Sequence, residues 1–245
     1  VENRLRRWFT GEELTNMKLT IPSNAEKILH ILEENGYEAY VVGGCVRDSI
    51  LGSCPNDWDI TTSASPLQVK ELFPRTVDTG LQHGTVTVLM DKEGYEVTTY
   101  RVDGDYEDGR HPKQVMFTSS LEEDLKRRDF TINAMAYHPV RGLVDLFHGM
   151  DDMQNKIIRC VGDPMERFHE DALRILRAVR FSAQLGFTID DETKKGICAL
   201  APNLKCVSAE RIQTELVKLL VSPHPDYLRV AYETGITREF LPEFD

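Results

Sequence analysis

Two aspartates separated by a single residue, Asp57 and Asp59, are the side chains in this sequence best suited to bind a metal. They belong to the stretch DWDITT, which we predict to be a strand, and residues i and i+2 of a strand face the same side about 7 Å apart. Two such carboxylates can hold divalent cations, and oxygen-only ligands favour Mg²⁺ or Mn²⁺. A pair of these ions suits in-line nucleotidyl transfer. Taken alone, the pattern is also typical of a solvent-exposed strand.

Two adjacent glycines, Gly43 and Gly44, lie between a predicted strand, YEAYVV, and a short predicted helix, CVRDSILG. They leave backbone N–H groups open to a ligand, and the start of a helix favours phosphate. Arg47, in the first turn of the helix, could reach a phosphate oxygen. Because the acids follow within two short elements, a phosphate cradle and a metal site could share one end of the sheet. A plain tight turn is the alternative.

Glu96 is the candidate for a third carboxylate at the same site. The segments HGTVTVLM and YEVTTY are rich in β-branched residues and are separated by DKEG, which predicts a β-hairpin. Glu96 opens the EVTTYR stretch of the second strand, and this strand could pair beside DWDITT. The alternative is an ordinary charge at the edge of a hairpin.

The segment RRDFTINAMA places Arg128 and Asp129 beside a predicted helix start, with Asn133 one turn further on. Guanidinium, carboxylate and amide groups placed together can bind ribose hydroxyls and phosphate. Taken alone, an arginine next to an acid is more often a surface salt bridge.

The segment EDALRILRAVRF carries Asp171, Arg174, Arg177 and Arg180 at steps of three residues. Each such step turns about −60° around a helix, so we expect the first three on one face and Arg180 displaced from it. An aspartate beside an arginine presents acceptors and donors together, as reading the Watson–Crick edge of a base requires. An exposed ladder of salt bridges is the alternative.

These side chains require a scaffold of strands followed by helices. We predict an α+β fold: a catalytic domain at 1–155, with a mixed or antiparallel sheet, and an all-α domain at 156–245. The hairpin excludes a doubly wound parallel sheet. The last segment, FLPEFD, shows no helix stop or polar tail, and we expect it to end within a longer helical region.

Composition limits the class of protein. The 245 residues are 41% hydrophobic and carry a net charge of −11, which argues against binding nucleic acid over the whole surface but allows a local basic groove. The 5 cysteines form no CxxC pair, so a disulfide framework or zinc site is not expected. No apolar run is long enough to span a membrane, and the first residues lack a signal-peptide core, so we expect a cytoplasmic protein.

Together, four stretches resemble the class II tRNA nucleotidyltransferases, the CCA-adding enzymes of the polymerase-β-like nucleotidyltransferase superfamily. They occur in the family's order and cover roughly residues 25 to 240. The stretches are GGCVRDSILGSCPNDWDITTSA, HGTVTVLMDKEGYEVTTYRVDGDYEDGRHPKQVMF, LEEDLKRRDFTINAMAYHP and RFHEDALRILRAVRFSAQLGF.

The resemblance implies a polymerase-β-like head that carries catalysis, then a helical neck and the start of a body. It implies metal binding by Asp57 and Asp59, with Glu96 as the third acid. It also implies nucleotide contacts by Gly44, Arg47, Arg128, Asp129, Asp171, Arg174, Arg177 and Arg180. To this set we add Gly43 and Asn133, from their positions beside the turn and beside Asp129. Within that set, Asp129 is linked to ribose recognition, and Asp171 and Arg174 pair with the incoming base.

The implied reaction is addition of C, C and A to the acceptor end of tRNA, without a nucleic-acid template, from CTP and ATP with Mg²⁺. The segment 101–117 is full length, whereas enzymes of the family that add only CC typically lack this loop. This favours CCA or A addition. The alternatives are an A-adding enzyme, a bacterial poly(A) polymerase and, more distantly, a non-catalytic nucleotide- or RNA-binding module.

Overall fold

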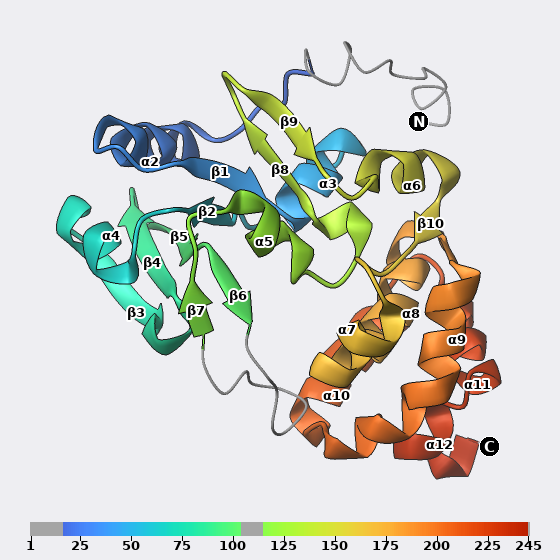
Figure 1. Ribbon diagram of the computed structural model, residues 1–245. Helices are drawn as coiled ribbons and strands as arrows, with labels where there is room; N and C mark the ends of the chain where they lie inside the picture. The colour runs from blue at the N-terminus through green and yellow to red at the C-terminus, as the bar shows by residue number, and fades with distance from the viewer. Residues whose placement is uncertain (1–16, 104–114, 245) are drawn as a thin grey trace. The chain divides into compact units, whose positions relative to one another are not determined.

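The computed structural model describes residues 17–103 and 115–244 (Figure 1). The segment 101–117, whose length bears on the choice between CCA and CC addition, is therefore described only at its ends. These ends pair as antiparallel strands, β6 (Arg101–Asp103) and β7 (Val115–Phe117). The central residues, on which that choice depends, lie outside the described residues.

The chain forms two compact units. The first holds the described residues up to Asp103, together with Val115–Arg128 and Ile132–Gly149. The second holds Asp129–Thr131 and the chain from Met150 onward. The predicted domain boundary after residue 155 coincides with the end of a helix, α6, and stays a prediction.

A seven-stranded mixed sheet is the framework of the first unit, in the order β3–β4–β5–β2–β1–β8–β9. Neighbouring strands are antiparallel except β2 and β5, which are parallel. This confirms the predicted mixed sheet. The strands are β1 Ala39–Val42, β2 Ile60–Thr62, β3 Thr76–Gly80, β4 Thr85–Met90, β5 Glu93–Thr99, β8 Met135–His138 and β9 Gly142–Asp145.

The predicted hairpin is formed by β4 and β5, with Met90 opposite Glu93. Its turn is tighter than the four residues DKEG, because only Asp91 and Lys92 separate the strands. Both have positive φ, 49° and 71°, as a two-residue turn with the twist of the strands demands.

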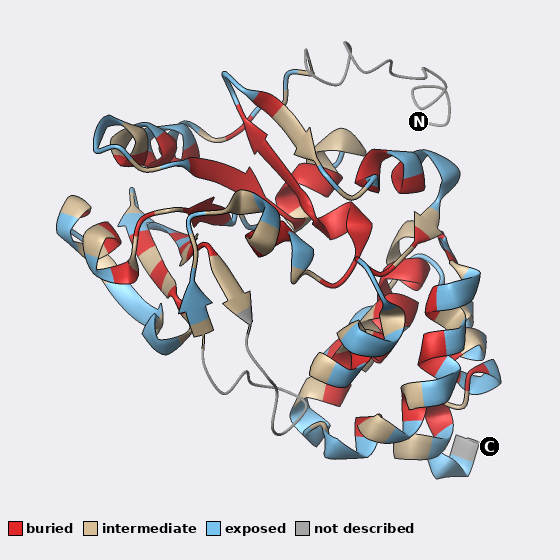
Figure 2. Cartoon of the chain, in the orientation of Figure 1, coloured by how far each residue is buried: buried red, intermediate tan, exposed pale blue. Residues whose placement is uncertain are grey.

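The α-helices among the described residues of the first unit are α2 Ser23–Glu34, α3 Gly44–Ile50, α4 Pro66–Leu72 and α5 Leu121–Lys126. Ser120 begins α5, since its hydroxyl accepts a hydrogen bond from the backbone N–H of Glu123 at 3.3 Å. Leu125 of α5 packs on Tyr40 and Val42, alternate residues of β1. Figure 2 shows that β1 and β8 are buried along their length, so the core follows the middle of the sheet.

The second unit is helical, as predicted, with one short addition. Its helices are α6 Gly149–Asn155, α7 Pro164–Glu170, α8 Leu173–Leu185, α9 Asp191–Leu200, α10 Ala209–Leu220, α11 Leu228–Glu233 and α12 Thr237–Phe240. The addition is a parallel pair of short strands, β10 (Ile157–Ile158) and β11 (Thr188–Ile189). The largely buried α8 ends at Gly186, whose φ of 66° suits a glycine C-cap.

Among the described residues, none of the helices has both the length and the apolar character needed to cross a membrane.

Candidate active site

Asp57 and Asp59 lie just before strand β2 rather than within it. Regular pairing with β1 begins at Ile60, because the preceding segment contains Pro55, which cannot donate a ladder hydrogen bond, and a bend at Asn56. The prediction of a strand over DWDITT was therefore too long at its start. Strand alternation does not fix the directions of the two acids, and both are exposed to solvent.

Glu96 lies next to Asp59 through the parallel pairing of β2 with β5. The register sets Ile60 opposite Val97, so Asp59 and Glu96 each stand one residue earlier on adjacent strands. Adjacent strands are about 4.8 Å apart, which places the two acids beside each other on the interior strands of the sheet. The predicted pairing of these strands is confirmed, while the role of Glu96 as a third acid stays a prediction.

The electrostatics of Asp59 show that the acids interact. Protein atoms displace part of the water around its carboxylate and raise its pKa, and the negative charge of Glu96 raises it further. Arg128 opposes these effects, and Asp57 adds a smaller rise. Because the side chain remains exposed, water screens these interactions. A cation held here would relieve the repulsion among the acids.

The described residues contain no group of three acidic, histidine or cysteine side chains arranged to hold a metal ion on its own. Magnesium usually binds through one or two carboxylates together with waters and substrate phosphates, so a site for it does not require three protein ligands. The exposed oxygens of Asp57 and Asp59, with Glu96 adjacent, form a donor set of this kind. The residues present therefore fit a divalent cation bound jointly with a substrate.

The glycine turn has the form expected of a close backbone approach. Gly43 has a φ of 82°, which side chains other than glycine rarely adopt, and α3 begins at Gly44. A Cβ added at Gly43 would lie 3.2 Å from Nη1 of Arg128. The turn is therefore glycine both for its backbone conformation and for the guanidinium beside it.

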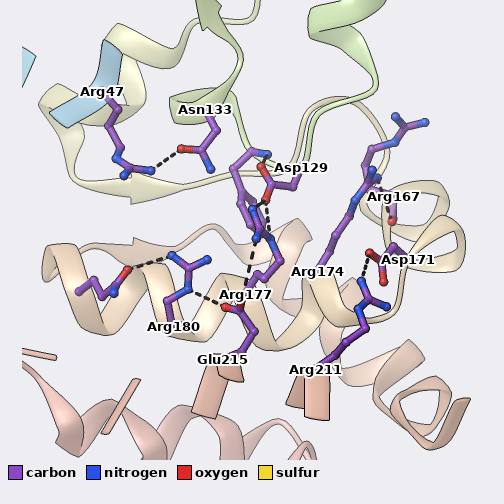
Figure 3. Close-up of polar contacts among 12 residues, drawn as sticks. Arg47, Asp129, Asn133, Arg167, Asp171, Arg174, Arg177, Arg180, Arg211 and Glu215 are labelled. Atoms are coloured by element: carbon purple, nitrogen blue, oxygen red, sulfur yellow. Dashed lines mark hydrogen bonds and ion pairs between the residues drawn. The ribbon is translucent and has the colours of Figure 1, made fainter. Parts of the chain in front are cut away.

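Arg47 is buried and held in place from two sides. Its Nε donates to Oδ1 of Asp48 at 2.8 Å, and its Nη1 donates to the side-chain oxygen of Asn133 (Figure 3). Asn133 belongs to a short 3₁₀ turn, Thr131–Asn133. Asn133 was predicted as a nucleotide contact, and the observed hydrogen bond shows that it also orients Arg47.

In the second unit, Asp129 and Arg177 form a close ion pair (Figure 3). Oδ2 of Asp129 accepts from Nε of Arg177 at 2.9 Å and from its Nη2 at 2.6 Å. Burial lowers the pKa of Arg177, but Asp129 and then Glu215 outweigh it, so the net pKa is raised.

Asp171 is not on the same helix as the arginines that follow it, which corrects the predicted shared face. It lies in the break between α7 and α8, with φ −143° and ψ 104°. Its Oδ1 accepts from the N–H of Leu173 at 3.0 Å, so it caps α8 and interrupts the helix there. Its Oδ2 accepts from Nη2 of Arg211 at 2.8 Å (Figure 3).

Arg174 and Arg180 are each held by a glutamate. Nη1 of Arg174 donates to Glu170 at 2.6 Å, and Nε of Arg180 donates to Glu215 at 2.7 Å. Arg180 is buried, and burial lowers its pKa against the opposing charge of Glu215. Glu215 also lies 3.8 Å from Nη1 of Arg177, so Arg177 and Arg180 share this glutamate, whereas Arg174 bonds to Glu170.

Sequence reasoning missed the partners Glu170, Arg211 and Glu215. Glu170 could have been found, because it stands four residues before Arg174, the spacing of a helical ion pair. Arg211 and Glu215 also stand four apart, on α10, but nothing local connects them to α8. Only the packing of the second unit reveals that pairing.

Residues 39–159 match the family described as the poly A polymerase head domain. Residues 186–245 match the family described as the probable RNA and SrmB-binding site of polymerase A. The chain is 55% identical over 212 residues to the CCA-adding enzyme of Lactiplantibacillus plantarum, covering 86% of this chain and 51% of that protein.

Two solved structures show the same likeness. The Bacillus stearothermophilus CCA-adding enzyme in complex with CTP is 44% identical, with a TM-score of 0.81 over 89% of this chain and 53% of that one. The Thermotoga maritima CCA-adding enzyme complexed with tRNA is 26% identical, with a TM-score of 0.78 over 95% of this chain and 55% of that one.

The mixed sheet and the head-domain match define a polymerase-β-like nucleotidyltransferase, a class that typically uses divalent metal ions. Within that class, the chain belongs to the class II tRNA nucleotidyltransferases, the CCA-adding enzymes. The chain spans about half the length of the curated relatives it matches.

Proposed function

We propose that this chain contains the catalytic and nucleotide-selecting parts of an enzyme that adds C, C and A to the 3′ end of tRNA from CTP and ATP. The observation that carries the proposal is the placement of Asp59, directly before β2, beside Glu96 of the parallel strand β5, with the charge of Arg128 acting on Asp59. Family membership supplies the reaction, because the relatives of known name are CCA-adding enzymes.

In this proposal Asp57 and Asp59 hold Mg²⁺, or Mn²⁺ in its place, and Glu96 is the third acid. When bound, the ions supply activation of the attacking tRNA hydroxyl and neutralisation of the triphosphate charge. Arg128 and the Gly43–Gly44 turn contact the triphosphate, because a cation and open backbone N–H groups there favour anionic oxygens. The buried Arg47 adds a fixed positive charge beside the same turn.

In the second unit, Asp171 and Arg174 choose the base, Asp129 contacts the ribose, and Arg177 and Arg180 support them. Arg174 bonds to Glu170, and Asp171 to Arg211, so both present groups already oriented by partners. To pair with a base edge, one carboxylate oxygen of Asp171 and one guanidinium N–H of Arg174 must bond to the base, either in addition to their present partners or in place of them. Cytosine and adenine each offer an exocyclic amino donor, whereas guanine and uracil offer an oxygen there.

The acceptor end of tRNA is the second substrate, as the match of residues 186–245 to a probable RNA-binding family supports. The division of labour between a catalytic head at 1–155 and a helical neck at 156–245, in the cytoplasm, belongs to the same proposal.

The test is incorporation of labelled nucleotides into a tRNA lacking its 3′ CCA, with each NTP supplied singly and in pairs. We expect two C residues from CTP alone, and completion by A when ATP is added. GTP and UTP should not be incorporated. The control is Asp57→Ala, which should abolish incorporation while leaving the fold intact.

A poly(A) polymerase is the second candidate, favoured by the head-domain match. The same assay separates the two, because a poly(A) polymerase extends with long A tails and uses no CTP. A chain that adds A only to a tRNA already ending in two C residues is instead an A-adding enzyme. Binding of nucleotide without incorporation identifies a non-catalytic module.

A further inference from the structure

Asp124, in the middle of the short helix α5, is a fully buried carboxylate of the first unit. Its Oδ1 accepts from Nε and Nη2 of Arg127 at 3.0 and 2.8 Å. Its Oδ2 accepts from the hydroxyl of Thr61 at 2.9 Å. A buried carboxylate is costly unless charges and hydrogen bonds compensate it, and here the arginines hold its pKa below the usual value despite burial.

The same carboxylate also reaches Arg128, four residues further along the chain. Nη2 of Arg128 lies 3.3 Å from Oδ2 of Asp124. Arg128 lies just beyond the end of α5, so helical backbone geometry does not fix its side chain. The contact with Asp124 does. Thr61 lies in β2, two residues after Asp59, and ties the carboxylate to the strand that follows the metal-binding acids.

The other end of the Arg128 guanidinium faces the proposed site. Its Nη1 lies against Gly43, 3.2 Å from where a Cβ would stand. Its charge acts on Asp59, whose pKa it lowers. One nitrogen is thus anchored in the interior while the other lies at the phosphate turn, the arrangement of a cation held in a fixed direction.

Loss of the Asp124 carboxylate would free the Arg128 guanidinium to pair with another acid. Without a charge at Asp124, the remaining attraction on Arg128 is toward Asp59, the carboxylate proposed to bind metal. The arginine would then neutralise an acid instead of facing a triphosphate.

We propose that Asp124 is a positioning residue for nucleotide binding, which fixes the Arg128 guanidinium between the interior and the Gly43–Gly44 turn. This inference rests on the proposed function, since it assigns Arg128 to the triphosphate. It does not make Asp124 catalytic, because the buried carboxylate acts only through the arginine.

The experiment is a double-mutant cycle on CTP affinity, measured calorimetrically with the whole chain in the presence of Mg²⁺. Asp124→Asn keeps the shape and removes the charge, and Arg128→Met removes the guanidinium. We expect each to raise the Kd for CTP about tenfold, as loss of one well-placed charged contact does. The double variant should bind no more weakly than Arg128→Met, because both changes remove one interaction.

Glu33→Gln is the matched control. This change also removes a carboxylate of the first unit that binds an arginine, Arg141, and a second side chain, His138. It does so away from the acids and the glycine turn. It should leave the Kd unchanged. Thermal unfolding of every variant shows whether it is folded.

Wild-type affinity in Asp124→Asn, or additive effects in the double variant, would overturn the proposal. If Asp124→Asn does not fold, Thr61→Val replaces it in the cycle, because it removes one hydrogen bond to the carboxylate and keeps the charge. We then expect about a twofold rise in Kd that disappears in the Arg128→Met background. A wild-type chain that binds no CTP would instead contradict the proposed function, and this inference would fail with it.

Discussion

The acids beside strands β2 and β5 and the arginines around α8 differ in how their charges are balanced. In the first unit, Asp59 stands among like charges, and its pKa is raised by partial loss of water and by Glu96. In the second unit, the arginines are paired: Arg177 with Asp129, Arg180 with Glu215, and Arg174 with Glu170. Binding of a cation would stabilise the acids around Asp59, whereas the arginines around α8 are already stabilised by their acidic partners.

The difference teaches what each region needs from a substrate. A cluster of acids whose charge Arg128 offsets only in part gains free energy from a divalent cation, so it is suited to binding metal with triphosphate. A network of satisfied ion pairs gains little from charge alone. It can discriminate among ligands, because only a base with the right donors and acceptors replaces the contacts it disturbs.

The largest expected effect separates activity from stability in the first region. Asp59→Asn should lower the rate of CTP incorporation at least about a hundredfold, because it removes a metal-binding charge. It should not lower the thermal midpoint, since it also removes a charge that its surroundings disfavour. Incorporation assays and thermal unfolding on the same preparation check both parts. The exposed Asp78, which pairs with Lys70, gives the control Asp78→Asn.

Glu215→Gln tests the opposite behaviour in the second region. The side chains of Glu215 and Arg180 are only 5% and 8% exposed, so the change leaves a buried guanidinium without its charged partner. We expect the free energy of unfolding to fall by about 3 kcal/mol, measured by urea denaturation. A variant as stable as wild type would show that the two regions do not differ as described.

Arg174→Ala sharpens the comparison at the level of specificity. Its discrimination of CTP and ATP against GTP and UTP should fall by about tenfold, because a base contact is removed, while the rate with CTP falls less. The ratio of kcat/KM values for the four nucleotides measures this. Arg229→Ala changes an exposed arginine of α11 and should leave the ratios alone. Unchanged discrimination in Arg174→Ala contradicts its proposed contact with the base.

The smallest effect is the dependence of stability on pH. The first unit contains one carboxylate with a lowered pKa and one with a raised pKa. Asp124 has a lowered pKa, so its contribution is present above the unfolded pKa of about 4 and is lost as pH falls through the folded value. Asp59 has a raised pKa, so its contribution is present in acid and is lost as pH rises.

Thermal midpoints from pH 3 to 7 check these signs. Asp124→Asn should be less stable than wild type at neutral pH and converge with it in acid. Asp59→Asn should match wild type in acid and equal or slightly exceed it at neutral pH, because its exposed carboxylate is well screened. An Asp124→Asn variant that becomes less stable than wild type only in acid would contradict the lowered pKa of Asp124. An Asp59→Asn variant less stable than wild type at neutral pH would contradict the raised pKa of Asp59.

Local chemistry made much of this molecule predictable. The hairpin, the glycine turn and the pair of acids each depend on a few consecutive residues, and alternating or β-branched patterns reveal them. The pairing of Glu96 beside Asp59 could be suggested but not its parallel direction, which depends on how distant strands meet. The cap formed by Asp171 was missed because a periodic pattern of charges continues through the break in the helix.

The partners of the arginines were the least predictable part. Arg211 and Glu215 lie far along the chain from Asp171 and Arg180, and only packing joins them. Asp124 shows a related limit. Its spacing of three and four residues from Arg127 and Arg128 is visible in the sequence, but its burial and its hydrogen bond with Thr61 depend on tertiary packing.

The parallel pairing of β2 with β5 has a consequence for how this site tolerates change. Asp59 and Glu96 are brought together by backbone hydrogen-bond register, not by the fit of their side chains. Core substitutions that preserve the strands should therefore leave their spacing intact. Insertion or deletion of one residue in β5 would instead turn Glu96 to the other face of the sheet. Variation at this site is thus constrained in length more tightly than in composition.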